Sequence, residues 1–487
     1  MPGPGIQDYL LTALQAASDG GATYADVREV STRSQSLATR GPAVEAVDGS
    51  ESLGFGVRVL VDGAWGYAAS ALVGEDEGAA LTAARAVAVA KASATAIERP
   101  VELVPEPVHV DEWTGPFERD PFDVALEEKL ELLLAASEPL QAAPRIRAGR
   151  ATMDLVRTRT TFASTEGARI VQTTLHSGAG MEATAVDGSD AQSRSFPGSF
   201  RGHLAAGGYE VIGSMSLTDH VDQTAEEAAA LLSAPECPSG ESDLVLDGHQ
   251  VMLQVHESVG HPTELDRVLG MEAAYAGTSW VGIPDLGKLS YASEHVSITA
   301  DGTTPGGLGS ARYDDEGVEM RRVDLVRDGV LVGMQSSRET AAALGHDRSN
   351  GTMRADGWEN FPLIRMTNIN LLPGEGTLED LIADIDAGVY MATNKSWSID
   401  DKRKNFQFGC EIAWEIKNGK LGRMLKDPRY TGITQDFWNS CDGVAGEDEW
   451  FVWGTPNCGK GQPGQVMRVG HGTSPARFRR ASIGLGS

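Results

Sequence analysis

Cysteine, positive charge and long apolar runs are all scarce in this sequence. Its 487 residues include only four cysteines, too few for a disulfide framework in a chain of this length, so we expect a reducing compartment. Lysine and arginine total 41 against 69 aspartate and glutamate, which gives a formal net charge of −28. Such an acidic protein opposes binding to phosphate backbones, so we do not expect nucleic acid as a partner.

Membrane-spanning runs are also missing. A helix needs about 20 apolar residues to cross a bilayer. The stretch richest in alanine and valine, residues 75–93, is interrupted by Arg85 and Lys91. The start of the chain, Met1 to Asp8, has neither the basic nor the apolar region of a signal peptide. We therefore expect no membrane partner and a cytoplasmic location.

The length of the chain indicates two domains. A chain of 487 residues exceeds what one hydrophobic core usually supports, and 41% apolar residues are enough for two cores. The best linker is the Pro-containing stretch at residues 234–240, Ala-Pro-Glu-Cys-Pro-Ser-Gly. We place an N-terminal domain at residues 1–233 and a C-terminal domain at residues 241–487.

The N-terminal half combines helical and strand patterns. Helical periodicity marks residues 6–18, 75–93, 123–137 and 218–232, and Pro139 should lie just beyond the third of these helices. Two-residue alternation marks residues 24–30, 36–47, 54–67, 147–163 and 168–185. We expect helices packed on an antiparallel sheet. We find no cluster of candidate metal ligands in this half, in contrast to the C-terminal half. We therefore expect the N-terminal half to serve assembly and substrate enclosure.

One N-terminal strand carries two aromatic residues beside small ones. Trp65 and Tyr67 lie in the Gly-rich strand at residues 54–67, which could offer a flat edge to another subunit. Alternatively, the two rings pack beneath the helix at residues 123–137.

The C-terminal half is mostly strand. Alternation marks residues 296–300, 318–326, 330–335, 364–371, 406–416 and 450–453, and a helix is predicted at residues 378–387. Asp328-Gly329 and Asn418-Gly419 are typical of tight hairpin turns. The predicted fold class is α+β, with N-terminal helices packed on an antiparallel sheet followed by a β-rich C-terminal domain that carries a metal-site helix.

That helix contains His256, Glu257 and His261 in an otherwise apolar pattern. Two histidines four residues apart lie about 40° apart around a helix, whereas five residues separate them by about 140°. To share a metal, these histidines require the helix to widen by one residue or to end between them. We expect Gly260 to tolerate the necessary dihedral angles and Pro262 to move His261 out of the α region.

A catalytic zinc usually has three protein ligands, so a third must come from elsewhere. Glu264 is within reach of the helix end. Cys410 lies in an alternating strand and is best read as structural, and Cys441 precedes an acid that disfavours its thiolate. Cys458 lies between Asn457 and a Gly-Lys-Gly sequence, where backbone N–H groups and Lys460 favour the thiolate. The residues alone leave Glu264 and Cys458 both open.

Glu257 is adjacent to a ligand, so its carboxylate can accept a proton from water activated by the metal and deliver it to a leaving amine. The same residues would also suit a zinc hydrolase of a non-peptide amide. A non-catalytic alternative is a peptide-binding or scaffold subunit whose structural metal has four protein ligands.

The segment His256-Glu-Ser-Val-Gly-His261, followed by Pro-Thr-Glu, resembles the His-Glu-x-x-x-His motif of TldD in the TldD/PmbA (TldE) family. The PmbA-type partner lacks this motif, so the chain resembles the catalytic branch. The likeness covers most of the chain and includes Asp315-Glu-Gly317, Ser349-Asn-Gly351, Arg354-Ala355, the segment from Pro362 to Asn368, and Cys458-Gly-Lys460.

This resemblance implies a zinc-dependent metallopeptidase that cleaves unfolded or small peptides. It implies that His256, His261 and Cys458 bind Zn²⁺ while Glu257 acts as the general base. It also implies an active dimer that encloses the site, formed either with a PmbA/TldE-like subunit or with a second copy of the chain.

Overall fold

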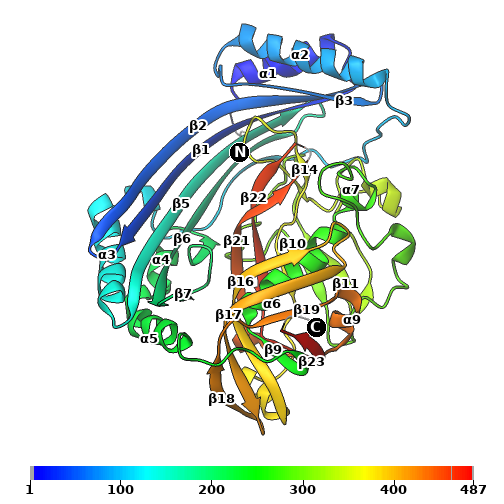
Figure 1. The fold of residues 1–487 in the computed structure, drawn as a ribbon. Coiled ribbons are helices and arrows are strands. Elements are labelled where there is room, and N and C mark those ends of the chain that lie inside the picture. The colour runs from blue at the N-terminus through cyan, green and yellow to red at the C-terminus, as the bar shows by residue number, and fades with distance from the viewer. Residues whose placement is uncertain (1–4, 462, 485–487) are drawn as a thin grey trace.

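The computed structural model describes residues 5–461 and 463–484, and its fold is α+β, as predicted. The N-terminal half forms a long, curved, eight-stranded sheet (Figure 1). Six of its strands follow the order β3-β2-β1-β5-β6-β4, and β7 and β8 each pair with β6 outside this order. Every pairing is antiparallel except that between β4 and β6. Its strands are β1 (Tyr24–Arg40), β2 (Ala43–Val61), β3 (Ala64–Ser70), β4 (Val110–Thr114), β5 (Ile146–Ser164), β6 (Arg169–Asp187), β7 (Asp190–Phe196) and β8 (His203–Ala206).

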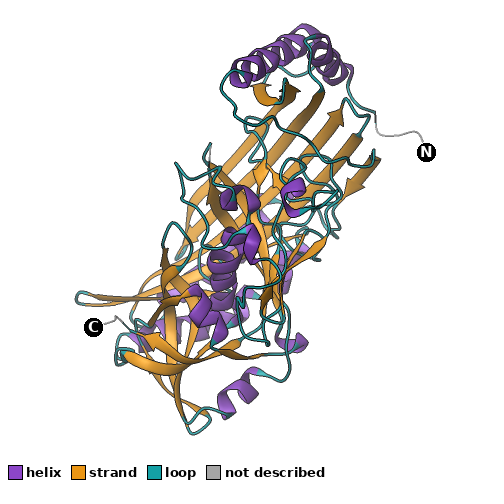
Figure 2. Cartoon of the chain, turned by 90° about the vertical axis from the view of Figure 1, so that its right-hand side faces the viewer, coloured by secondary structure: helices purple, strands orange, loops and turns teal. Residues whose placement is uncertain are grey.

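Helices pack near the two ends of this sheet. They are α1 (Asp8–Asp19), α2 (Asp76–Ala94), α3 (Leu126–Ala142), α4 (Glu210–Ser214) and α5 (Val221–Leu231). The α1 and α2 pair covers one end and α3 to α5 cluster at the other, as Figure 1 and the side view in Figure 2 show. Alanine-rich faces of α1 and α2 bury against the valines of β2, which forms one apolar cluster.

The C-terminal half lies against the concave side of the sheet (Figure 1). Five strands in the order β16-β9-β23-β19-β17 form a closed path, because β17 also pairs with β16. The strands of this half are β9 (Gly240–Leu246), β10 (Ile298–Asp301), β11 (Arg322–Arg327), β12 (Val330–Leu331), β13 (Met353–Arg354), β14 (Leu363–Ile364), β15 (Ile369–Leu371), β16 (Ala387–Ile399), β17 (Asn405–Lys417), β18 (Lys420–Leu425), β19 (Arg429–Ile433), β20 (Cys441–Val444), β21 (Phe451–Lys460), β22 (Gln465–Thr473) and β23 (Ala476–Ile483). Its helices are α6 (Gly248–Val255), α7 (Leu265–Val268), α8 (Leu378–Ala383) and α9 (Thr434–Asn439).

Several predicted elements differ from the structure; for example, the strand predicted at residues 364–371 is two strands, β14 and β15. Residues 36–47 are not one strand, because the chain turns at Gly41, whose φ of +52° suits glycine. Pro139 lies inside α3 and not beyond it, and the buried Leu140 holds the last turn of this helix against the sheet. The helix predicted at residues 378–387 ends at Ala383, since the chain from Ala387 pairs with β17.

The structure contradicts one of the two interpretations of the aromatic residues in β3. The indole N–H of Trp65 donates to Glu339 at 2.9 Å, and the hydroxyl of Tyr67 donates to the Trp358 carbonyl at 2.5 Å. Both rings also contact Phe361 edge to face. The two rings therefore join the large sheet to the C-terminal half and do not pack under α3. Strand β3 lies at the edge of the sheet, and contact of this edge with another subunit stays a prediction.

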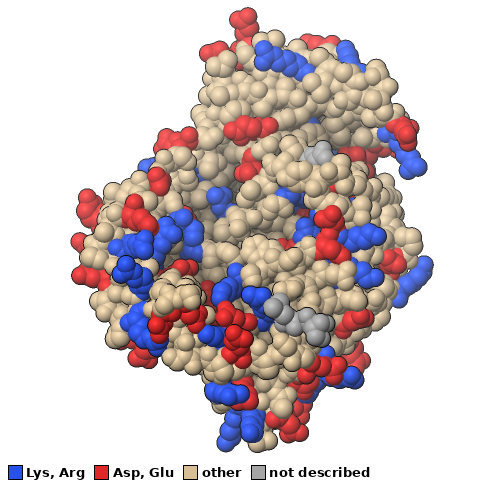
Figure 3. All heavy atoms as spheres, viewed as in Figure 1, with Lys and Arg blue, Asp and Glu red and all other residues tan. Residues whose placement is uncertain are grey.

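Acidic and basic side chains are interspersed on the face shown in Figure 3, which is hollowed between the large sheet and the C-terminal half. Among the described residues, no helix is both long enough and apolar enough to cross a membrane. The division of the chain at residues 233–241 stays a prediction.

Candidate metal centre

The site begins with a helix that is buried along its whole length. All eight residues of α6 are buried. At its first turn, the Asp247 carboxylate accepts hydrogen bonds from the backbone N–H groups of Gln250, at 2.7 Å, and of Thr393 in β16, at 3.1 Å. This cap fixes the start of α6 to the neighbouring strand, so the residues at its other end have a defined position.

The helix widens where the second histidine must turn. Residues His256–Gly260 form a π turn, in which the backbone N–H of His261 donates to the carbonyl of His256, and a 3₁₀ turn follows. One extra residue per turn brings a five-residue spacing onto one face. Widening was one of the two alternatives expected from the sequence, but its expected causes were wrong.

His261 has φ −62° and ψ −45°, so Pro262 does not move it out of the α region. Gly260 also has ordinary helical angles, with φ −58°. Glycine is needed there because a Cβ atom would lie 2.2 Å from the Met366 sulfur. Close packing, and not unusual backbone geometry, explains this glycine.

The structure brings His256, His261 and Cys458 together. Their candidate ligand atoms all lie within 4.8 Å of one another, and each residue is 3% exposed. The Cys458 sulfur is 3.7 Å from Nε2 of His261. A tetrahedral zinc with usual bond lengths separates its sulfur and nitrogen ligands by about 3.6 Å. The cluster therefore has the dimensions of a zinc site.

Hydrogen bonds orient both imidazoles. Nδ1 of His471 lies 3.2 Å from the Ile369 carbonyl and must donate to it, so Nε2 of His471 accepts from Nδ1 of His256 at 2.9 Å. Nδ1 of His261 donates to Glu264 at 2.9 Å. In both ligands the proton is thus on Nδ1, which leaves the Nε2 lone pairs for a metal. The sequence reasoning missed His471, which follows no metal-ligand spacing.

Glu264 supports a ligand in this arrangement. Its Oε2 binds the Nδ1 side of His261, whereas Cys458 approaches Nε2. Lys460 Nζ lies 3.3 Å from the same Glu264 oxygen and 2.7 Å from Asp266. Lys460 was expected to favour the Cys458 thiolate directly. It is instead bound by carboxylates behind His261, and it lies with Cys458 in β21 and not in a loop.

The cysteines differ sharply in acidity. Burial raises the pKa of Cys410 well above its usual value and that of Cys441 to about 12. Burial opposes ionisation of Cys458 too, but the imidazoles of His256 and His261 lower its pKa well below the usual value. Cys458 is therefore the cysteine suited to bind a metal as a thiolate.

Glu257 faces a cavity of about 230 Å³, which is also lined by the two histidines and Cys458. Its Oε2 forms an ion pair with Nη1 of Arg403. Arg403 was not predicted as a site residue, because it lies in an Asp-Asp-Lys-Arg-Lys run that resembles an ordinary exposed turn. His249 lines the same cavity, and burial lowers its pKa to about 3, so its imidazole is neutral.

Three other residues in the family-like segments have structural partners. Glu316 pairs with Arg58 at 3.0 Å, Arg365 donates to the Cys458 carbonyl, and Asn368 accepts from the Gly309 N–H at 3.0 Å. These contacts hold strands and loops near the site without reaching the cavity.

Comparison with known proteins covers nearly the whole chain. The model of the PmbA/TldA metallopeptidase C-terminal domain matches residues 239–484, that of domain 1 matches residues 25–90, and that of the central domain matches residues 119–234. A metalloprotease of Methanothermobacter thermautotrophicus is 30% identical over 480 residues, which is 98% of each chain.

Two solved structures have the same fold. A Thermotoga maritima protein described as a modulator of a DNA gyrase superposes with a TM-score of 0.77 at 16% identity, over 98% of this chain and 99% of that chain. TldE from Thermococcus kodakarensis superposes with a TM-score of 0.73 at 15% identity, over 98% of this chain and 100% of that chain.

Proposed function

Because the chain belongs to the PmbA/TldA metallopeptidase family, we propose that it is a zinc-dependent peptidase that hydrolyses peptide bonds of unfolded or small peptides. The observation that carries the proposal is the convergence of His256, His261 and Cys458 on one cavity beside Glu257. Two neutral imidazoles and one thiolate are a common donor set for zinc.

Zinc bound there would lower the pKa of a water molecule and polarise the carbonyl of the scissile bond. Glu257 would accept the proton of the attacking water and deliver it to the leaving amine. Its ion pair with Arg403 engages Oε2, which leaves Oε1 to accept the proton. Arg403 would hold this carboxylate at the cavity, within reach of a bound peptide.

The substrate would be an extended chain. The ligand atoms are buried, and the cavity beside them holds only about 230 Å³, so a folded domain could not bring its backbone to the zinc. Strand-like peptides can bind β-rich surfaces through main-chain hydrogen bonds, which read little sequence. We expect a tightly folded, loop-free protein to resist cleavage and its denatured form to be cut. Equal cleavage of both forms would contradict this substrate class.

We further propose that the active form is a dimer with a PmbA/TldE-like subunit or with a second copy of the chain. The fold shared with TldE of Thermococcus kodakarensis supports a partner of similar shape, and the N-terminal half contributes none of the three candidate ligands. Sedimentation of the chain, alone and mixed with a PmbA-like protein, tests this. A monomer that is fully active alone would overturn it.

The central experiment measures zinc and turnover together. Glu257→Gln should retain zinc and lose peptide cleavage, because the carboxylate moves a proton but binds no metal. Cys458→Ala should lose zinc as well. Cys441→Ala is the matched control, because this buried cysteine lies outside the cluster. Its replacement should leave zinc content and peptide cleavage unchanged. Full zinc occupancy in Cys458→Ala would reject the ligand assignment.

A scaffold with a structural metal remains the second candidate, and it requires a fourth protein ligand. Within residues 5–461 and 463–484, the candidate cluster contains only three ligand residues, which favours an open, catalytic position. Normal cleavage by Glu257→Gln would contradict the proposed base. Cleavage of simple amides but not of a mixed peptide library would identify a non-peptide hydrolase.

A further inference from the structure

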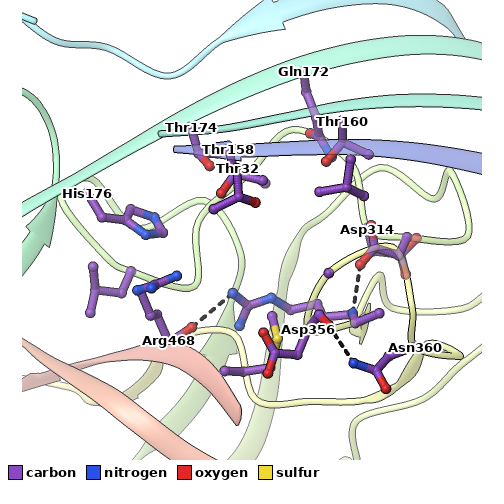
Figure 4. Close-up of a pocket in the computed structure, with 18 of the residues that line it drawn as sticks. Thr32, Thr158, Thr160, Gln172, Thr174, His176, Asp314, Asp356, Asn360 and Arg468 are labelled. Carbon is purple, nitrogen blue, oxygen red and sulfur yellow. Dashed lines mark hydrogen bonds between the residues drawn. The ribbon is translucent and has the colours of Figure 1, made fainter. Parts of the chain in front are cut away.

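A second cavity, of about 480 Å³, lies between the concave face of the large sheet and the C-terminal half. One wall is a row of polar side chains from β1, β5 and β6, namely Thr32, Thr158, Thr160, Gln172 and Thr174 (Figure 4). The opposite wall comes from residues 308–315, 354–360 and 466–468. This cavity contains none of the candidate metal ligands, so the proposed reaction does not account for it.

Arg468 and His176 lie together in this cavity and form no ion pair with another described residue; burial lowers the pKa of Arg468, and the nearby Asp356 and Asp154 offset this only in part. His176 is 8% exposed, and its Nε2 has no hydrogen-bond partner among the described residues. The Arg468 guanidinium forms no ion pair within the described part of the chain and points toward His176 (Figure 4). Burial, together with Arg468 and Arg354, lowers the pKa of His176 to about 3, so this imidazole is neutral and can donate one N–H.

Three of the four acidic groups of the cavity are already engaged, and the fourth, Glu359, is exposed. Asp314 accepts hydrogen bonds from the backbone N–H groups of residues 316 and 318. Asp315 pairs with Arg28 at 3.0 Å, and Asp356 accepts from the backbone N–H of residue 466. Figure 4 shows Asp314 on the side of the cavity away from His176 and Arg468. The free positive charge thus lies at one end.

A third cavity lies between this end and the candidate metal ligands. This third cavity, of about 450 Å³, shares Arg468 with the second cavity and shares Phe200, Pro456 and Asn457 with the cavity at the metal ligands. In the β21–β22 hairpin, Cys458 pairs with Met467, the residue before Arg468. An extended peptide could therefore run from the metal ligands to Arg468 along one path.

We propose that the cavity end formed by Arg468 and His176 binds a carboxylate of the peptide substrate. The proposal rests on the proposed function for the identity of the substrate as a peptide. A largely buried guanidinium without a counter-ion is costly, and a carboxylate would satisfy it with charge-assisted hydrogen bonds. His176 Nε2–H would donate a further hydrogen bond. The carboxylate belongs either to the peptide C-terminus or to an Asp or Glu side chain.

Titration calorimetry of zinc-loaded Glu257→Gln protein tests this without turnover. The probes are an acetylated, alanine-based octapeptide with a free C-terminal carboxylate, its C-terminal amide, and that amide with one internal Glu. The free carboxylate or the Glu-containing amide should bind at least about tenfold more tightly than the plain amide. Whichever of the two gains affinity identifies the source of the carboxylate. Equal binding of all three peptides would overturn the proposal.

Variants then assign the preference to this site. Adding Arg468→Met to the Glu257→Gln protein should remove the difference in affinity between the peptides. Arg468→Lys in its place should keep part of this difference. Arg322→Met is the control, because Arg322 is exposed and lines none of the three cavities. A preference that survives Arg468→Met would contradict the assignment. Cleavage by the wild-type protein is measured separately, so a failure of the peptidase proposal is distinguishable from a failure of carboxylate binding.

Discussion

The large sheet and the C-terminal half meet through two regions of opposite electrostatic character. In the first, which we call the paired region, Arg58 is 1% exposed and lies 2.7 Å from Asp26 and 3.0 Å from Glu316. Glu316 also accepts from the backbone N–H of Arg338, whose side chain binds Glu166 at 2.8 Å. In the second, the cavity end formed by Arg468 and His176, no carboxylate partner exists among the described residues.

The difference shows how the same residue type serves two purposes. A buried arginine with internal carboxylates joins two parts of a fold, because its charge is neutralised and its donors are used. A buried arginine without them remains able to bind an anion from outside. The paired region should therefore control stability, whereas the cavity end should control binding.

Breaking the paired region should have the largest effect on stability. Arg58→Met leaves Asp26 and Glu316 buried without their cation, and such a loss costs about 3–5 kcal/mol of the free energy of unfolding. Urea denaturation measures it. Arg33→Met is the control, because its pair with Glu51 is exposed and worth below about 1 kcal/mol. Equal losses in both variants would show that the paired region does not join the two halves.

The candidate metal centre has both properties, a paired charge and a role in binding: Lys460 pairs with Glu264, which in turn contacts the candidate ligand His261. Lys460→Met should weaken zinc binding by about 10–100-fold, because Glu264 would no longer be held against His261. Competition with a chelator measures this affinity. The control is Lys426→Met, which removes a more exposed ion pair with Asp190 and should leave the zinc affinity unchanged. Unaltered zinc affinity in Lys460→Met would limit Lys460 to a structural role.

Arg468→Met should have the smallest effect on stability. The Arg468 side chain is half-buried and has no ion-pair partner in the described ranges, so its replacement by methionine should leave the free energy of unfolding unchanged or slightly higher. Thermal unfolding checks this, and the same variant should lose its preference for peptide carboxylates. A destabilisation as large as that of Arg58→Met would show that Arg468 stabilises the fold, as Arg58 does.

The repeating patterns of the N-terminal half predicted its elements well. Strands β5 and β6 and helix α2 lie within two residues of their predicted bounds. Strands β5 and β6 form a hairpin and α2 has a clear helical pattern, so periodicity and turn residues describe them. The C-terminal strands β16, β22 and β23 were missed. Strand β23 pairs with the distant β9, whereas β16 and β22 pair with their sequence neighbours β17 and β21 but have a weak local alternation.

The residues of the candidate site also differ in how far the sequence could predict them. His256, Glu257 and His261 are close in sequence, and their spacing predicted a widened helix. Cys458 lies 197 positions from His261, so residue chemistry alone could not choose it over Glu264. Only the tertiary structure placed Cys458 against Nε2 of His261 and Glu264 against Nδ1.

The sequence by itself determined the α+β class, the acidic surface and the motif of two histidines with a glutamate, because composition and short-range periodicity encode them. Tertiary structure decided which charges are paired. Arg58, Arg403 and Arg468 look alike in the sequence, yet one joins the two halves, one holds Glu257 and one forms no ion pair with the residues that the structure describes. A charge acquires its role from groups that only folding brings within a few ångströms, where burial makes each partner, or its absence, matter.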